Sequence, residues 1–130
     1  MLTVLPDAET VVIQALNASA AVTGIVGTRI GTRIPDTPTW PLIRVAKVAE
    51  VFTDDEGSES SLIQVECWAD SDATASLLAR TVVAARKDLP GTYAAGWLAL
   101  VGVDSGPIPA PDPESERARY LLTLAVDVGA

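Results

Sequence analysis

The chain has 130 residues, 48% of them apolar and 20% charged, so it is long and apolar enough to fold around its own core as one domain over residues 1–130. Its formal charge of −8 excludes the basic footprint of a nucleic-acid-binding protein, and the absence of histidine removes the commonest general base and metal ligand near neutral pH. A single cysteine excludes an intrachain disulfide, which fits assembly in a reducing cytoplasm.

The N-terminal segment is predicted to form one helix over residues 7–17 and a short helical turn over residues 20–26. Asp7 is a good N-cap, Glu9 suits the positive end of the helix dipole, and apolar residues follow at helical spacing. Gly27 is expected to end the second turn. The segment lacks the basic region of a signal peptide, and no stretch is apolar enough to span a bilayer, so no membrane partner is expected.

A proline-rich bend follows the helical opening. The tetrapeptide Gly-Thr-Arg-Ile occurs at residues 27–30 and again at 31–34, and three prolines lie within residues 35–41. Because proline removes a hydrogen-bond donor and restricts the residue before it, residues 35–41 are predicted to form an extended loop. The two tetrapeptides and the Pro-Thr-Trp-Pro run at 38–41 contain no histidine, cysteine or carboxylate, which points to assembly rather than chemistry.

Two strands, residues 42–51 and 61–69, are predicted to form an antiparallel hairpin. The second alternates strictly, with Ile63, Val65 and Cys67 on one face and Gln64, Glu66 and Trp68 on the other. Residues 52–60 are expected to form a polar, acidic tip. Its carboxylates lack the spacing of a calcium loop, so they are interpreted as solvated charge; they are Asp54, Asp55, Glu56 and Glu59.

The second half of the chain is predicted to contain one long helix and two strands. Asp70 or Ser71 is expected to cap the helix, which runs to about Leu89 and ends at Pro90. Strands are predicted over residues 97–103 and 117–128. The intervening residues 104–116 are interpreted as a loop too proline-rich to pair; its prolines are Pro107, Pro109, Pro111 and Pro113.

The order of elements is therefore α-β-β-α-β-β. It predicts an α+β fold in which two helices pack on one face of a small, mostly antiparallel sheet of about four strands.

No combination of residues in the chain suits catalysis or cofactor binding. Cys67 has no histidine to activate it, and its strand position beside Ile63 and Val65 indicates a buried structural thiol. Helix capping is sufficient to explain Asp70 and Asp72. The sequence thus predicts a protein that is not an enzyme and that has no cofactor and no metal site.

Trp68 leaves two interpretations open. It is predicted on the sheet face opposite Ile63 and Val65, and a tryptophan there needs a cover. The cover is either a loop of the same chain or a neighbouring subunit, since aromatic residues and arginine are enriched at interfaces.

The order of these parts resembles the tail terminator, or tail completion, family of long-tailed bacteriophages. The resemblance rests on the opening helix that ends near residues 22–27, the Arg29-Ile30 segment, the Pro-Thr-Trp-Pro approach into the strand Leu-Ile-Arg-Val at 42–45, and the strand at 63–69 that leads into an alanine-rich helix. It covers most of the chain through loose apolar patterns, and the proline-rich segment from Gly106 to Pro113 has no counterpart in it.

The resemblance implies a structural virion protein with an α+β fold. Such proteins form a hexameric ring that caps the completed tail tube and then provides the surface for head joining. The implied partners are further copies of the chain, the tail tube protein, and a head–tail connector or head-closure protein; the implied location is the head-proximal end of the tail. Acidic charge suits a channel that DNA passes without specific binding.

Three sets of residues become candidates on this basis. Subunit contacts are expected at Arg29, Arg33, Trp40 and Trp68. The ring lumen or the tube-facing rim is expected to receive Asp54, Asp55, Glu56 and Glu59. Contact with a different virion protein is expected of the proline segment, with Pro107, Pro109, Pro111 and Pro113. Two alternatives stay open, which are another neck component (a head-closure or connector protein) and a small ligand-binding α+β domain.

Overall fold

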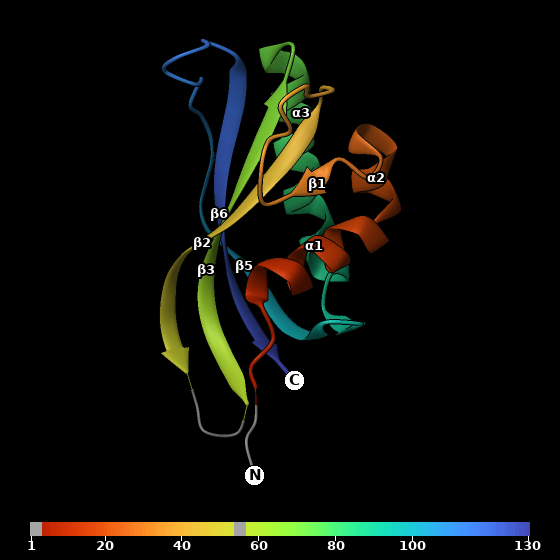
Figure 1. Ribbon diagram of the computed structural model, residues 1–130, viewed down its shortest axis with the longest axis vertical. Coiled ribbons are helices and arrows are strands. Elements are labelled where there is room, and N and C mark those ends of the chain that lie inside the picture. Colours follow the sequence, from red (N-terminus) through yellow and green to blue (C-terminus); the bar gives the residue numbers. More distant parts are fainter. Residues whose placement is uncertain (1–3, 54–56) are drawn as a thin grey trace.

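A computed structural model describes residues 4–53 and 57–130 (Figure 1). It contains three α-helices, a 3₁₀ turn and six strands within these ranges. In chain order they are α1 (Ala8–Ala18), α2 (Ala20–Val26), β1 (Ile30–Gly31), β2 (Leu42–Thr53), β3 (Ser58–Ala69), α3 (Asp72–Ala85), the 3₁₀ turn (Arg86–Asp88), β4 (Gly91–Tyr93), β5 (Gly96–Pro109) and β6 (Ala118–Gly129).

The strands form one twisted sheet in the order β1-β2-β3-β6-β5-β4. β1 pairs parallel with β2, and every other neighbouring pair is antiparallel. The α+β class and the four long strands are as predicted, but the sheet is mixed and has two further short strands at its margins. The segment over residues 20–26 is a true third helix, because the Ser19 side chain accepts a hydrogen bond from the Val22 N–H and caps it.

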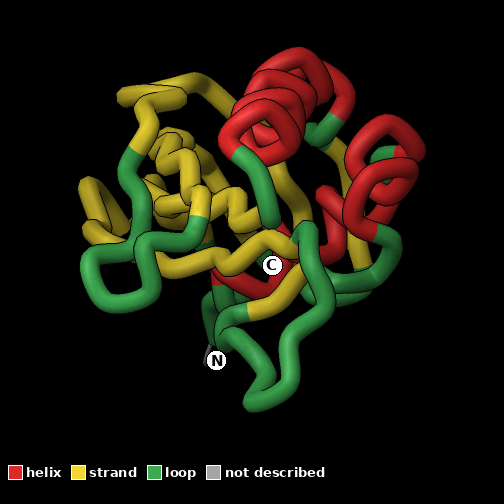
Figure 2. The backbone as a smooth tube through the Cα atoms, turned by 90° about the horizontal axis from the view of Figure 1, so that it is seen from above, coloured by secondary structure: helices red, strands yellow, loops and turns green. Residues whose placement is uncertain are grey.

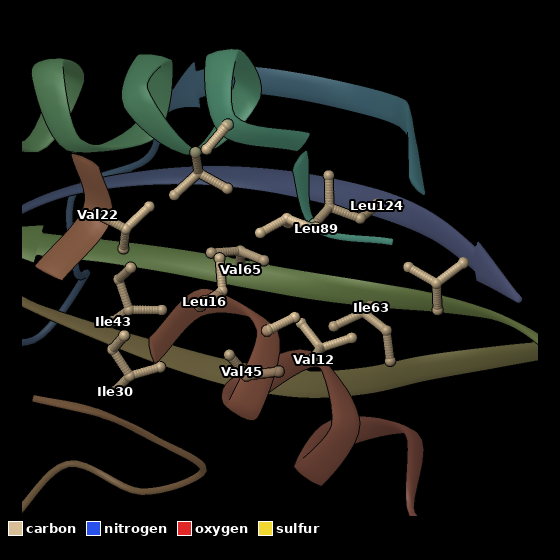
Figure 3. Packing of buried hydrophobic residues seen from close by; sticks show 14 of the residues in the cluster. Val12, Leu16, Val22, Ile30, Ile43, Val45, Ile63, Val65, Leu89 and Leu124 are labelled. Carbon is tan, nitrogen blue, oxygen red and sulfur yellow. The ribbon is translucent and has the colours of Figure 1, made fainter. Parts of the chain in front are cut away.

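The helices lie together on one face of the sheet, as Figure 2 shows from above. The core fills the space between them and the strands, and Figure 3 shows its side chains. Ile63, Val65 and Cys67 are fully buried on the helix side, as their alternation predicts. Leu16 of α1 and Leu78 of α3 meet this face. The sheet therefore has one face covered by the helices and one open face, and the open face is available for contacts with other molecules.

Asp7 caps α1 as predicted, and its carboxylate accepts a hydrogen bond from the Glu9 N–H.

No single helix in the described ranges is long and apolar enough to cross a membrane. The pair α1 and α2 would together meet the length and composition of a membrane span, but the two helices are bent by 90° relative to one another.

Ser71 rather than Asp70 caps α3. Its backbone is extended, and its Oγ accepts a hydrogen bond from the Thr74 N–H at 3.2 Å. This bond satisfies one of the free N–H groups of the first turn and fixes the point where β3 passes into the helix.

Replacing Ser71 with alanine is expected to lower the free energy of unfolding by about 1 kcal/mol, because the Thr74 N–H loses its acceptor. Urea denaturation followed by circular dichroism measures the change. The matched control is Ser76→Ala, which removes only an exposed hydroxyl that accepts from Arg80, and it should change stability by less than about 0.5 kcal/mol. Equal effects at the two serines would contradict the capping role.

The prediction that residues 104–116 form a loop is wrong for its first half. β5 continues to Pro109 and pairs with β6 through Ile108 and Leu121. Beyond Leu98 no described strand pairs with the outer side of β5, and prolines are tolerated on such an edge because no outer ladder needs their missing N–H. An irregularity between Ser105 and Ile108 accommodates the Gly-Pro step.

The β2–β3 hairpin is antiparallel as predicted but longer, since β2 runs to Thr53 and β3 begins at Ser58. Of the acidic tip, Asp54, Asp55 and Glu56 lie outside the described residues. Glu59 is in β3 rather than in the loop, and its side chain is buried on the helix side of the sheet. Glu59 is therefore not part of an exposed acidic tip.

Candidate interaction surfaces

The first Arg-Ile segment joins α2 to the sheet. Gly27 ends α2 with a positive φ of 59°, and β1 follows at Ile30. The Arg29 Nε donates to the Pro41 carbonyl at 2.8 Å, while the Arg29 carbonyl accepts from the Ile43 N–H at 3.0 Å. Arg29 thus holds both ends of the proline loop together. The doublet is a structural bend, as its position between helix and strand suggested.

Arg33 lies on the loop itself and is exposed. Neither Arg33 nor Arg29 forms an ion pair with a carboxylate of the described ranges. Arg29 is half-buried and donates a hydrogen bond to the Pro41 carbonyl, whereas Arg33 is exposed. Arg33 is therefore the more accessible of the two to another protein.

An aromatic and arginine cluster covers the upper part of the open sheet face. Trp40, from the proline loop, stacks on Trp68 of β3 with ring centroids 5.9 Å apart and an interplanar angle of 26°. The Arg119 guanidinium lies 5.1 Å from the Trp68 centroid, and that of Arg117 lies 4.2 Å from the Trp40 centroid. Trp68 is only 6% exposed as a result. Within the monomer its cover is a loop of the same chain, and Trp40 presents the outer, half-buried surface.

Glu66 supports this cluster from beneath. Its Oε1 accepts a hydrogen bond from the Trp68 indole Nε1 at 3.0 Å, and its Oε2 forms an ion pair with Arg44 at 2.6 Å. The carboxylate is buried, so both bonds hold the indole in place. The sequence alone placed Glu66 on the open face but did not identify its partners. The register of the hairpin sets Glu66 directly opposite Arg44, so a prediction of that register would have revealed the ion pair.

A second charged cluster lies at the lower end of the hairpin. Lys47 binds the buried Glu59 carboxylate at 3.0 Å and Glu50 at 3.2 Å. Burial by itself lowers the pKa of Lys47, but the hydrogen bonds to Glu59 and Glu50 outweigh it and raise the pKa above its ordinary value. One ammonium is thus shared by two carboxylates, which leaves the cluster with a formal charge of −1.

Glu50 should contribute a pH-dependent part of the stability. Hydrogen bonds that the Glu50 carboxylate accepts, first from Thr53 and then from Lys47, lower the pKa of Glu50 from 4.5 to about 2. A carboxylate whose pKa is lower in the folded state stabilises it above pH 4.5 and loses that effect as the pH falls toward 2. Thermal scans should therefore show a steeper fall in Tm over this window for the parent chain than for Glu50→Gln. Parallel curves would contradict the assignment.

The proline segment divides between two structures. Pro107 and Pro109 belong to β5, while Pro111 and Pro113 lie in the loop to β6. The loop is closed by Asp112, whose carboxylate accepts from the Ser115 N–H and hydroxyl, and these bonds lower the pKa of Asp112. It stands at the same end of the molecule as the Trp40 cluster, because Arg117, at the end of the loop, lies over Trp40, and Arg119, at the start of β6, lies over Trp68.

Exposed apolar side chains gather on two strands, which sequence reasoning did not anticipate. The described residues include eight large apolar side chains that are exposed, and six of them belong to β2 or β5. These six are Val48, Val51 and Phe52 on β2 and Leu100, Val103 and Ile108 on β5. A groove of about 400 Å³ between the two strands has Val51 at one side and Leu100 at the other.

The described residues offer little for chemistry. No group of three or more potential metal ligands comes together among them. Cys67 is buried, and burial raises the pKa of its thiol, which keeps the thiol protonated and unreactive. The distinctive surfaces of the described residues are the aromatic and arginine cluster and the exposed apolar side chains of β2 and β5, and both are typical of protein–protein contacts.

Comparison with known proteins also points to a structural protein. The model of the family described as tail completion protein gp17 matches residues 10–117. Among solved structures, a chain from the virion of a native gene transfer agent particle is similar, with a TM-score of 0.59 and 21% identity over 95% of each chain. At that identity the likeness concerns the fold. No curated protein matches the sequence of this chain significantly.

Proposed function

Because the chain belongs to the tail completion protein gp17 family, it is a phage tail structural protein and not an enzyme, and we propose that it closes the finished tail tube as a hexameric ring that also joins the head. The observation that carries the proposal is the family match over residues 10–117. The fold shared with a chain of a gene transfer agent virion supports it. In this function the partners are other copies of the chain, the tail tube protein and a head-proximal connector, and the site of action is the head-proximal end of the tail.

The experiment is electron microscopy of particles made with and without the chain. We expect loss of the protein to give headless tails of irregular length, and labelled protein to appear as a six-fold ring at the head-proximal tip. Tails of normal length that carry label on the head side of the joint would instead indicate a head-closure or connector protein. A compact monomer that binds a small ligand would indicate a ligand-binding domain.

Charge supports a role around passing DNA. The chain carries a formal charge of −8, and like charge keeps a phosphate backbone from adhering to a channel wall. We place the hairpin tip with Asp54, Asp55 and Glu56 at the ring lumen or the tube-facing rim. Glu59 is excluded from direct exposure by its burial against Lys47. A map of the ring with this tip on the outer circumference would contradict the assignment.

We assign the subunit contacts in the ring mainly to Arg33, and in the second place to Arg29 and Trp40. Arg33 is exposed and has no ion pair within the described ranges, so a carboxylate of a neighbouring acidic copy is a suitable partner. Arg33→Glu should reduce ring formation more than Arg80→Glu, which changes an exposed arginine on α3. Equal ring yields for both variants would contradict it.

The loop over residues 110–117 is assigned to a different virion protein. Prolines reduce the conformational freedom that a binding loop loses on docking, and Asp112 closes this loop further. Replacing residues 111–116 by a short glycine linker keeps Arg117 over Trp40 and the hydrogen bonds between Ala110 and Arg119, so it should leave the chain folded and impair joining to the tube or to the head. Normal joining with the replaced loop would contradict the assignment.

A further inference from the structure

The long sheet has two open edges, and they differ from one another. β1 covers β2 only at Ile43 and Arg44, and the Glu9 carboxylate accepts from the N–H of Lys47 just below. From residue 48 to 53 no described strand lies on the outer side of β2, opposite β3, and Figure 1 shows this part at the outer margin of the sheet. At the other side, β4 covers β5 only to Leu98, so residues 99–103 are open as well. Unpaired edges of this length are templates for another strand.

The two open edges stand at the same level of the sheet. Phe52 pairs with Ser60, Ser60 with Asp127, and Asp127 with Leu100, so one row of residues crosses from the β2 edge to the β5 edge. A second copy placed beside the first in the same orientation therefore needs no large vertical shift to bring the edges together.

Strand direction is also compatible. β2 is antiparallel to β3, β3 to β6 and β6 to β5, so β5 runs opposite to β2. A copy in the same orientation thus presents its β5 antiparallel to the β2 of its neighbour. Pairing β2 with a second β2 would satisfy one edge and leave the β5 edges unpaired, whereas head-to-tail pairing satisfies both edges.

The side chains favour this contact as well. The open segments carry five of the exposed large apolar side chains, Val48, Val51, Phe52, Leu100 and Val103. Residues 99–103 hold no charged side chain, and the carboxylate of Glu50 is paired with Lys47. Two copies that are strongly acidic overall thus meet through mainly apolar strips, in which Glu50 is the single carboxylate and is partly neutralised by Lys47, so their mutual repulsion there is small.

We propose that residues 48–53 of one copy pair antiparallel with residues 99–103 of the next, so that the sheets of adjacent copies become continuous. The inference rests on the proposed ring and names its subunit contact. The head-to-tail arrangement uses two different edges of each chain, and repeating it by rotation closes a ring in which both open segments of every copy are paired.

Cysteine cross-linking of the full chain tests the contact. The single variants Val51→Cys and Leu100→Cys are mixed, because Val51 and Leu100 of one copy line the same groove and a double variant could be linked within the chain. Both positions are well exposed, at 66% and 63%, and a short bismaleimide should give covalent dimers from the mixture on a denaturing gel. Cys67 is buried and should stay unmodified. The matched control mixes Val51→Cys with Leu77→Cys, which puts the second cysteine at an exposed position on α3, and it should give no dimer. Cross-linking of Val51→Cys alone would indicate symmetric β2 pairing and overturn the inference.

Charge substitution gives an independent readout. Val51→Lys and Leu100→Glu each place a charge against the apolar strip and should raise the concentration for half-assembly roughly tenfold, while the double variant should recover most of the loss. An unchanged Tm of each variant at low protein concentration shows that the monomer is intact. Failure of the double variant to recover assembly would count against direct contact.

The inference and the proposed function fail in different ways. When the recombinant chain does not assemble, the same cross-linking is done on purified particles. Six-fold rings at the tail tip without Val51–Leu100 cross-links would overturn the edge pairing and leave the tail function intact. Cross-linked rings found elsewhere in the particle would overturn the tail function and leave the edge pairing intact.

Discussion

Gly106→Ala is expected to lower the free energy of unfolding by about 3 kcal/mol, because Gly106 combines a backbone strain with a backbone clash. Its φ is +82°, a region that L side chains rarely adopt. An added Cβ would lie 2.5 Å from the Leu121 carbonyl oxygen and 3.0 Å from the Leu122 Cα. Both atoms belong to the β6 backbone, which cannot withdraw without breaking its pairing with β3 and β5.

Gly102→Ala is the matched control on the same strand. A Cβ at Gly102 meets nothing within 4 Å, and alanine restricts the unfolded chain more than glycine, so a change within about 0.5 kcal/mol is expected. Urea denaturation at low protein concentration measures both variants on the monomer. Similar effects at Gly106 and Gly102 would show that β6 adjusts freely around the irregularity in β5, contrary to the geometry.

The hairpin and the core were predictable because they depend on local pattern. Ile63, Val65 and Cys67 alternate with polar residues, and a period of two places such residues on one face whatever else the chain does. The first helix was predictable for the same kind of reason, since Asp7 and the apolar spacing after it are local signals.

The extension of β5 through Pro107 and Pro109 was not predictable from the residues alone. Whether a strand accepts proline depends on whether its outer side is paired, and that is set by where β4 stops. The short strands β1 and β4 have two and three residues, too few for a periodic signal. Each forms because a longer strand provides it with an edge to pair with, β2 for β1 and β5 for β4.

The candidate surfaces were predictable only in part, because they depend on pairs of residues far apart in sequence. Trp40 and Trp68 stand out in the sequence as candidates, but their stacking requires the proline loop to fold back over the open face. Likewise, the burial of Glu59 follows from the position of Lys47, not from the acidic run beside it. The open strand edges are a property of sheet order, which a pattern of single strands does not contain.

Glu66→Ala is the second substitution with a large expected effect, about 3 kcal/mol in the free energy of unfolding. The carboxylate is the acceptor for the buried Trp68 indole N–H and the partner of the Arg44 guanidinium, and alanine removes both roles at once. Glu66 is only 5% exposed, so water cannot readily replace the lost acceptor. Urea denaturation followed by tryptophan fluorescence reports directly on the affected cluster.

Two further variants separate the hydrogen bond from the charge. Glu66→Gln keeps an amide oxygen for the Trp68 N–H but removes the charge facing Arg44, so about half the effect of alanine is expected. Asp70→Ala breaks an ion pair of similar length, 2.7 Å to Arg117, but its carboxylate is 78% exposed and the change should be less than about 0.5 kcal/mol. If alanine at Glu66 were as mild as alanine at Asp70, the Trp40 stack and Arg119 alone would hold Trp68. Glu66 would then be a consequence of the cluster rather than its support.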